Sequence, residues 1–403
     1  MGAPRGDGQE AEARDPRLDG LRGLAIALVI FYHTTQFGLA RGVVANALSV
    51  IPSVGWSGVD LFFVLSGFLI TGILLRAKAS PSYYRAFYAR RVLRIFPLYY
   101  AVLVVFLLIV PRIPLFAIAN DFWYPGVARQ GIWYWLYLSN LHAALAGAWQ
   151  HQILDITWSL AIEEHFYLIW PWVVRRCDER RLLAICAVTA LGALAMRAAL
   201  AAAGAPSIAG YTLTPCRLDT LATGAAIALA VARPGGFAAL ARPARAVLPA
   251  ALALFAACYA WVRLRAPAVP PARGLEAATV RALSFTTEPL ILTVGFTLLC
   301  VVYGALLVWV LTAPAGSLRA RAFEAAWLRS FGRYSYGMYL LHLPAAMLLT
   351  EFLPPGRYPR QYLLVQPVFW ALAFASSYGL ARLSWLVVEQ PMLRLKRFFP
   401  YRL

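Results

Sequence analysis

The sequence has few charged residues and few cysteines, and both shortages restrict what the chain can be. Only 14% of its 403 residues are charged, whereas 61% are hydrophobic, which is too apolar for one water-soluble core of this length. The five cysteines have no CxxC spacing and no paired-histidine motif, so we expect neither a disulfide framework nor a metal site. We find no internal repeat, and we expect no appended soluble domain. These shortages indicate a protein whose solvent is lipid.

Long apolar runs recur along the chain, and most are close to the roughly 20 residues that a helix needs to cross a bilayer. We therefore expect an all-α, polytopic integral membrane protein with about ten transmembrane helices. The runs are 21–39, 57–75, 95–111, 157–174, 182–203, 217–233, 245–263, 284–312, 334–350 and 362–388.

The polar ends of the chain and the distribution of arginine predict its orientation. Residues 1–16 lack the apolar centre of a signal peptide, so we expect a disordered cytoplasmic tail and a first helix that directs insertion. Short loops rich in Arg and Lys stay in the cytoplasm, and with the N-terminus inside, the inner loops hold more arginines than the outer ones. Both termini are then cytoplasmic, with residues 393–403 as a basic tail. This topology explains most of the net charge of +19, so we expect no nucleic-acid partner.

Four arginines are expected where the chain enters the membrane from inside. Arg22 lies at the inner end of the first expected helix, and Arg90, Arg91 and Arg94 lie at the inner start of the third. Arginine suits phosphate because its planar guanidinium donates two parallel hydrogen bonds and stays charged when partly desolvated. We predict that these residues surround an anion, although an RRxxR cluster before a span is also an ordinary topology signal.

A second set of polar residues is expected nearer the outer side. His33 follows Arg22 by eleven residues, which places both on nearly the same helix face about 16 Å apart. Asp60, Glu163 and Glu164 are expected at a similar depth to His33. A neutral histidine in a low-dielectric cavity is a good general base, and a carboxylate can orient it. Glu163 and Glu164 point about 100° apart, so both can hardly face one small cavity.

Small and aromatic residues leave several alternatives open. Ser66 interrupts a bulky run, where it permits close approach of a neighbouring helix or of a slim ligand. Ser66 or Ser159 is a conceivable acylated nucleophile, but neither has a histidine within one turn, which favours direct transfer. Ser57 lies in a weak G-x-S-G pattern and serves equally well as a helix N-cap. The aromatic segment 111–156 suits either an interfacial belt or a platform for a sugar or lipid headgroup.

Seven ordered motifs resemble those of the membrane acyltransferase-3 family, whose members O-acylate sugars and related acceptors. His165 stands where that pattern has Gln, which leaves its role open. The motifs are Arg17–Ala25 with His33, Gly58–Ile70, Arg90–Pro97, Trp158–Tyr167, Arg217–Leu221, Ser335–Pro344 and Glu389–Pro391.

The resemblance implies an acyltransferase membrane domain over residues 17–392 in a bacterial inner membrane. Its donor would be acyl-CoA, most often acetyl-CoA, bound by the four arginines and Ser66. Its acceptor would be a hydroxyl of a sugar, glycolipid, polysaccharide precursor or glycosylated natural product. His33 would be catalytic, and from their expected depth we predict that Asp60 or Glu164 orients it. The implied acceptor-binding residues are Trp158, Glu163, Tyr167, Arg217, Asp219 and His342.

Two other classes of function remain as alternatives. Ten helices with intramembrane charges also suit a transporter or flippase for a sugar- or lipid-linked solute, but the sequence has no inverted repeat and no matched pair of broken helices. Intramembrane serine hydrolysis rests on the Ser57 pattern alone. Insensitivity to a fluorophosphonate would exclude it.

Overall fold

The structure is a computed structural model that describes residues 15–35, 43–113, 127–265 and 288–401. Within these ranges the chain forms helices and contains no strand, which confirms the all-α prediction. The longer helices are α1 (Pro16–Thr34), α2 (Val43–Ser53), α3 (Gly58–Arg76), α4 (Tyr83–Leu103), α6 (Val127–Trp135), α7 (Ser139–Ala146), α8 (Thr157–Arg176), α9 (Glu179–Ala202), α11 (Thr214–Val231), α12 (Gly236–Arg265), α14 (Phe296–Leu311), α16 (Ala326–Phe352) and α17 (Tyr362–Ser384). Short helices and turns of 3-10 or π geometry are η2 (Gly55–Ser57), η3 (Val104–Ile109), η4 (Val110–Arg112), α10 (Ser207–Thr212), η6 (Ile291–Gly295), α15 (Leu318–Glu324), η7 (Pro355–Arg357), η8 (Pro359–Gln361), η9 (Trp385–Glu389), α18 (Gln390–Arg394) and η10 (Leu395–Phe398).

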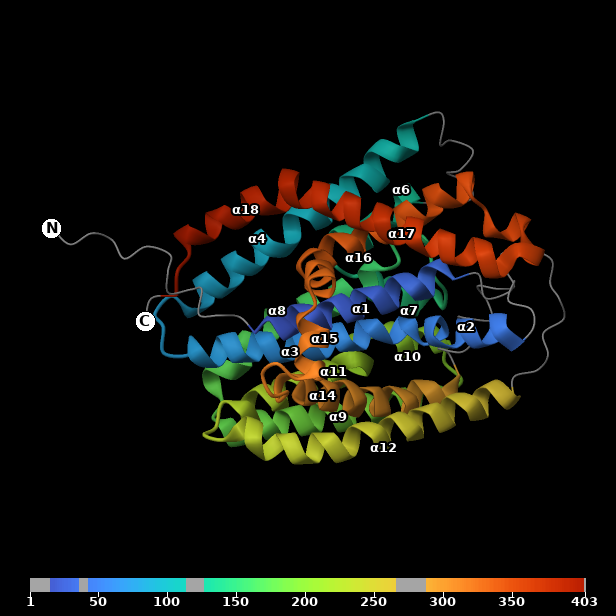
Figure 1. Cartoon of the computed structure of the whole chain (residues 1–403). Helices are drawn as coiled ribbons and strands as arrows, with labels where there is room; N and C mark the ends of the chain where they lie inside the picture. The colour runs from blue at the N-terminus through green and yellow to red at the C-terminus, as the bar shows by residue number, and fades with distance from the viewer. Residues whose placement is uncertain (1–14, 36–42, 114–126, 266–287, 402–403) are drawn as a thin grey trace.

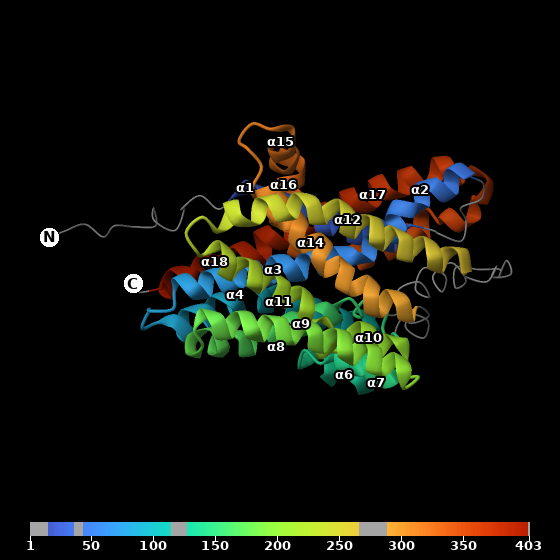
Figure 2. The same ribbon diagram turned by 90° about the horizontal axis from the view of Figure 1, so that it is seen from below.

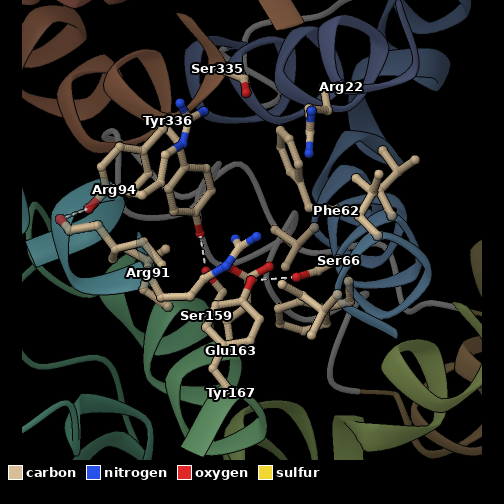
Figure 3. Close-up of a pocket in the computed structure, with 18 residues that line it drawn as sticks. Arg22, Phe62, Ser66, Arg91, Arg94, Ser159, Glu163, Tyr167, Ser335 and Tyr336 are labelled. Carbon is tan, nitrogen blue, oxygen red and sulfur yellow. Dashed lines mark hydrogen bonds between the residues drawn. The ribbon is translucent and has the colours of Figure 1, made fainter. Parts of the chain in front are cut away.

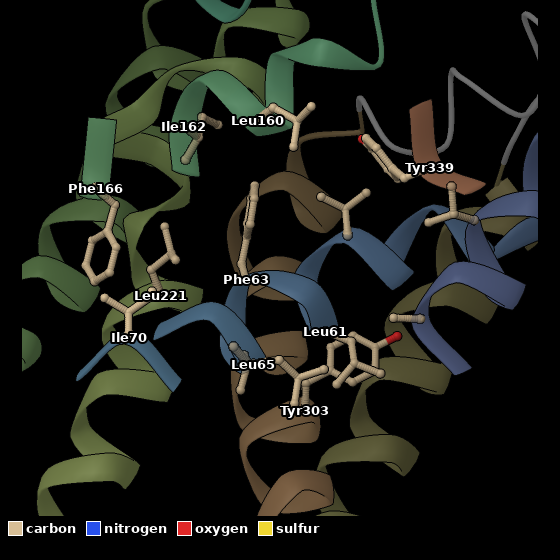
Figure 4. Close-up of a cluster of buried hydrophobic side chains, with 14 of the residues drawn as sticks. Leu61, Phe63, Leu65, Ile70, Leu160, Ile162, Phe166, Leu221, Tyr303 and Tyr339 are labelled. Atoms are coloured by element: carbon tan, nitrogen blue, oxygen red, sulfur yellow. The ribbon is translucent and has the colours of Figure 1, made fainter. Parts of the chain in front are cut away.

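Helix α3 lies at the centre of a bundle whose long helices run side by side (Figures 1 and 2). It packs against α1, α8, α11 and α14. Most of its apolar window is buried, whereas α9 and α12 lie at the periphery and bury far less of theirs. Figure 4 shows the core that results, in which Leu61, Phe63 and Leu65 of α3 meet Ile162 of α8 and Leu221 of α11.

Six helical segments of the described chain are long and apolar enough to cross a membrane. Four other helices, namely α1, α8, α11 and α16, have 18 to 27 residues but are not among the six. These four carry ionisable side chains, including Arg22, Glu163, Arg217 and His342. The six segments are Gly55–Arg76, Tyr83–Arg112, Glu179–Ala202, Gly236–Arg265, Ile291–Leu311 and Tyr362–Phe398.

Helix boundaries differ from the expected ones at both ends of the chain and before the third apolar run. Helix α1 begins at Pro16 because the Asp15 carboxylate accepts a hydrogen bond from the backbone N–H of Arg17 and caps it. Helix α4 begins at Tyr83 rather than near 95, so its arginines lie inside a helix. The C-terminal segment expected as a tail continues as α18 and η10. The start of α1 and the end of η10 lie at the same end of the bundle (Figure 1).

Glycines bring α1 and α16 into close contact. A Cβ atom on Gly332 would lie 1.8 Å from the Asp19 carbonyl oxygen, and one on Gly23 would lie 2.0 Å from that of Leu328. The same two helices meet again near their other ends, where His33 contacts His342. The two helices therefore run alongside each other in the same direction. Their closest approach tolerates no side chain.

We expect Gly332→Ala to lower the thermal unfolding temperature in detergent, because the added methyl group meets backbone that cannot rotate away. Overpacking of this kind costs about 1–3 kcal/mol. Gly192 in α9 is the matched control, since a Cβ atom there meets nothing within 4 Å. Gly192→Ala should be neutral or stabilising because alanine favours helix. Equal unfolding temperatures for the two variants would contradict this account.

Candidate functional site

A cavity of about 130 Å³ lies inside the bundle between α1, α3, α4, α8 and α16 (Figure 3). Small-molecule sites are usually about 300–1,000 Å³, so this cavity holds one part of a ligand rather than a whole cofactor-sized molecule. Its apolar wall includes Phe62, Phe63 and Leu69. Its polar lining residues are Arg22, Ser66, Arg91, Arg94, Ser159, Glu163, Tyr167, Ser335, Tyr336 and Tyr339.

Three guanidinium groups from two helices line the cavity. Arg22 comes from α1, and Arg91 and Arg94 come from α4. Arg22 also pairs with Asp19 of its own helix at 3.2 Å, and the Arg91 guanidinium lies 5.5 Å from the centre of a tyrosine ring in α8. Glu163 is the one carboxylate in the lining, so the charged groups of the wall sum to a positive charge. Such a wall attracts an anion.

Arg90 does not line this cavity, contrary to the sequence prediction. Its Nε donates a hydrogen bond of 2.7 Å to the carbonyl oxygen of Phe399, and its guanidinium lies 5.5 Å from the centre of the Tyr401 ring. The reason is geometric, because consecutive residues of a helix point about 100° apart. Arg90 therefore holds the C-terminal segment while Arg91 faces the cavity.

Hydroxyl groups surround the carboxylate in the cavity. The side chains of Ser66 and Tyr167 contact each other beside Glu163. Above them, the hydroxyls of Ser159 and Tyr339 lie 2.6 Å apart. The predicted residues Ser66, Glu163 and Tyr167 thus meet in one place.

Glu164 lies outside this lining, as its 100° separation from Glu163 predicts. Its Oε1 atom is buried and has no hydrogen-bond partner among the described residues. His165, the departure from the motif, places Nδ1 2.8 Å from the Thr214 hydroxyl and also lies outside the cavity lining. Within the described ranges, no group of three or more His, Cys, Asp and Glu side chains is placed to hold a metal ion.

His33 lies beyond the cavity and next to a second histidine. Its Nδ1 is 2.9 Å from the carbonyl oxygen of Val29 and 3.2 Å from Nε2 of His342. His33 contacts α16 through His342, and Arg22 shares the cavity lining with Ser335 and Tyr336 of that helix. The ring was expected to be buried in the same cavity, but it is exposed and does not line it. Tyr339 intervenes, since it lines the cavity while its ring centre lies 5.9 Å from that of His342.

Asp60 belongs to a closed cluster of charges and does not contact His33. Its Oδ1 accepts a hydrogen bond of 2.6 Å from Arg217, and Asp219 pairs with Arg197 of α9 at 2.7 Å. All four side chains are at most 4% exposed. Four aromatic rings lie within 6 Å of the Arg217 guanidinium, namely Phe63, Trp158, Tyr211 and Phe296.

The cluster changes the interpretation of three predicted acceptor-binding residues. Arg217, Asp219 and Trp158 are buried and lie outside the cavity lining, and Arg217 and Asp219 form ion pairs with neighbouring helices, so their binding of an acceptor stays a prediction. Sequence reasoning missed Arg197, although a single charge inside an otherwise apolar run was the available signal. It also missed Tyr339, although this residue lies inside the motif Ser335–Pro344.

The described part of the aromatic segment folds on itself. Trp133 stacks on His142 with ring centres 5.3 Å apart, and Asp155 accepts hydrogen bonds from Tyr134 and from the backbone of His151. Burial lowers the pKa of His151 to about 4, so its ring is neutral at pH 7. Three further polar and aromatic residues of the segment, Asn120, Asp121 and Trp123, lie outside the described residues.

Comparison with known proteins finds one matching protein family and several relatives. The profile of the acyltransferase domain family matches residues 15–385. The chain is 28% identical to peptidoglycan O-acetyltransferase OatA of Listeria monocytogenes over 410 aligned residues, which cover 96% of this chain and 57% of that protein. It is 26% identical to O-acetyltransferase OatA of Staphylococcus aureus, with 95% of this chain and 58% of that protein covered. The chain thus spans a little over half the length of these relatives. No solved structure is significantly similar to it.

Proposed function

The chain belongs to the acyltransferase-3 family, and from this premise we propose that it transfers an acyl group, most often acetyl, from acyl-CoA to a hydroxyl of a sugar-containing acceptor. The observation that carries the proposal is the set of three guanidinium groups that converge on one cavity from α1 and α4. Coenzyme A carries phosphates at one end and the acyl thioester at the other. An arginine-lined site with a separate histidine suits a donor of that shape.

The donor is proposed to bind with its phosphates toward Arg22, Arg91 and Arg94. Arg22 lies near the start of α1, and Arg91 and Arg94 lie in the first half of α4, toward the end of the bundle where α1 begins. His33 lies near the opposite end of α1. The slim arm of the donor would pass Ser66 and Tyr167 and then Tyr339. A cavity of about 130 Å³ accommodates such an arm but not a nucleotide.

The proposed reaction is a direct transfer with His33 as general base. The acceptor hydroxyl oxygen attacks the acyl carbonyl carbon while Nε2 of His33 takes the hydroxyl proton. The new C–O bond forms, the C–S bond of the thioester breaks, and the protonated ring returns its proton to the departing thiolate. Ser66 and Ser159 contact tyrosine hydroxyls and no histidine among the described residues, which argues against a seryl intermediate.

We propose a bacterial inner membrane location with ten crossings and both termini in the cytoplasm. Ten helices of the described residues have 16 residues or more, and each overlaps one expected span. The described ends of the chain lie at one end of the bundle, as an even number of crossings requires (Figure 2). The acyltransferase membrane domain is proposed to cover residues 17–392.

The acceptor is proposed to be a cell-envelope glycan or a lipid-linked precursor of one. The relative from Listeria is named for peptidoglycan, and the exposed position of His33 leaves its ring open to a large acceptor. Carbohydrate hydroxyls are the common feature of these acceptors.

The proposal is tested by incubating the purified protein with acetyl-CoA and a panel of glycan acceptors while free CoA is measured. We expect acceptor-dependent CoA release above the rate of thioester hydrolysis in water. No acceptor-dependent release with any donor, together with uptake of a labelled sugar-linked solute into vesicles without acyl-CoA, would favour the transporter alternative instead.

We expect Arg91→Gln to raise KM for acyl-CoA by about 10- to 100-fold with a smaller effect on kcat, because hydrogen bonds to charged groups contribute about 1.5–3 kcal/mol. Arg90→Gln is the matched control, since it removes the same charge from the neighbouring residue, which faces the C-terminal segment. Its KM should stay within about threefold of the wild-type value if the cavity binds the donor. An equal rise in both variants would indicate a general electrostatic effect rather than this site.

A further inference from the structure

His342 is buried beside the proposed catalytic residue and takes no part in the cavity. Its side chain is fully buried in α16, and its ring centre lies 4.9 Å from that of His33 with an angle of 55° between the planes. Its Nδ1 is 2.7 Å from the carbonyl oxygen of Tyr339 in the preceding turn. Its Nε2 is the atom that approaches Nδ1 of His33 at 3.2 Å. His342 is therefore bonded at both ring nitrogens.

The backbone partners determine which nitrogen of each ring carries the hydrogen. A carbonyl oxygen only accepts hydrogen bonds, so the ring nitrogen next to it must be a donor. His342 therefore carries hydrogen on Nδ1, which leaves a lone pair on its Nε2. His33 likewise carries hydrogen on Nδ1, because that atom faces the carbonyl oxygen of Val29. The Nδ1–H group of His33 is shared between this oxygen and the lone pair of His342.

We propose that His342 is the positioning residue for His33 and fixes the ring in the form that exposes a basic Nε2 to the acceptor. This inference rests on the proposed function, because it assigns a role within the same reaction. Nε2 of His33 has no hydrogen-bond partner among the described residues, and the ring is exposed. The lone pair needed to take the hydroxyl proton is thus on the open side of the ring.

His342 also compensates for the charge that forms during transfer. When Nε2 of His33 takes a proton, the ring becomes an imidazolium, and its Nδ1–H becomes a stronger donor. The lone pair of His342 accepts from that group, as a carboxylate does in many hydrolases. Asp60 and Glu164 were expected in this position, but Asp60 is bonded to Arg217, and the buried Oε1 of Glu164 in α8 has no hydrogen-bond partner among the described residues. A neutral ring performs the task here without burying another charge.

Variants of His342 test this role through kcat. His342→Leu removes the acceptor, and we expect kcat to fall by about 10- to 100-fold with KM for acyl-CoA unchanged, as is typical when the partner of a catalytic or ligating histidine is lost. His342→Gln places an amide oxygen near the same point and should recover most of this loss. The matched control is His142→Gln in α7, which should keep its activity within about twofold. Unchanged kcat in His342→Leu, or an equal loss in the leucine and glutamine variants, would overturn the proposal.

A second measurement does not depend on activity. Nitrogen-15 spectra of the histidine-labelled protein in lipid should show a protonated Nδ1 and an unprotonated Nε2 for both rings, with a scalar coupling between Nδ1 of His33 and Nε2 of His342. The His33 signals are identified by their loss in His33→Ala. A protonated Nε2 on either ring at pH 8 would refute the proposed arrangement. If the wild type transfers no acyl group at all, the proposed function fails while this coupling still tests the histidine pair.

Discussion

His33→Ala should lower kcat for acyl transfer by about 10²- to 10⁴-fold, which is the usual contribution of a positioned general base. The variant should keep its melting temperature and its elution volume, because the exposed ring contributes little to the core. KM for acyl-CoA should change little, since the proposed phosphate site lies about 16 Å away along α1. Initial rates of CoA release with the preferred acceptor measure the effect.

The exposure of His33 also makes chemical rescue possible. Imidazole added to His33→Ala should restore part of the rate, because the ring that it replaces lies exposed on the surface of the described structure. The same addition should leave His142→Gln unaffected. Normal transfer by His33→Ala without imidazole would remove this residue from the mechanism.

The second large effect concerns stability. Arg217→Met should destabilise the protein by about 3–5 kcal/mol, because it leaves the buried Asp60 carboxylate without its partner. The double variant Arg217→Met with Asp60→Leu should recover much of that loss, since replacing a buried ion pair by apolar side chains is often nearly neutral. Thermal unfolding in lipid nanodiscs measures both.

The control for this prediction is the exposed pair of Arg233 and Glu179, whose side chains are 53% and 45% exposed. Surface pairs contribute about 0–1 kcal/mol, so Arg233→Met should shift the unfolding temperature only slightly. If Arg217→Met and Arg233→Met prove equally stable, the buried cluster does not hold α3, α9 and α11 together. If the double variant is no better than the single one, the charges act separately.

The sequence predicted the positions of most long helices because apolar runs of membrane length are a strong local signal. The run 57–75 became Gly58–Arg76, and the run 157–174 became Thr157–Arg176. Boundaries were less predictable where ionisable residues occur inside a helix, as in α4. There the helix begins twelve residues before the expected apolar run, because hydropathy alone does not reveal that arginines continue it.

The side-chain pairs of the candidate site could not be predicted in the same way. His33 and His342 are 309 positions apart, and Asp60 and Arg217 are 157 apart. Hydropathy gives the depth of a residue in a helix but not the rotation of that helix toward its neighbours. Asp60 was therefore assigned to His33 on depth alone, whereas the packing of α3 against α11 turns it toward Arg217.

The glycine contacts between α1 and α16 have a consequence for the size of the donor. Arg22 and His33 lie on the same helix, so α1 itself sets their separation at about 16 Å, and the close contacts at Gly23 and Gly332 keep α16 from sliding along that distance. This fixed separation selects donors by length. A long thioester can contact Arg22 and His33 at once, whereas a compact activated acid such as acetyl phosphate reaches only one of them.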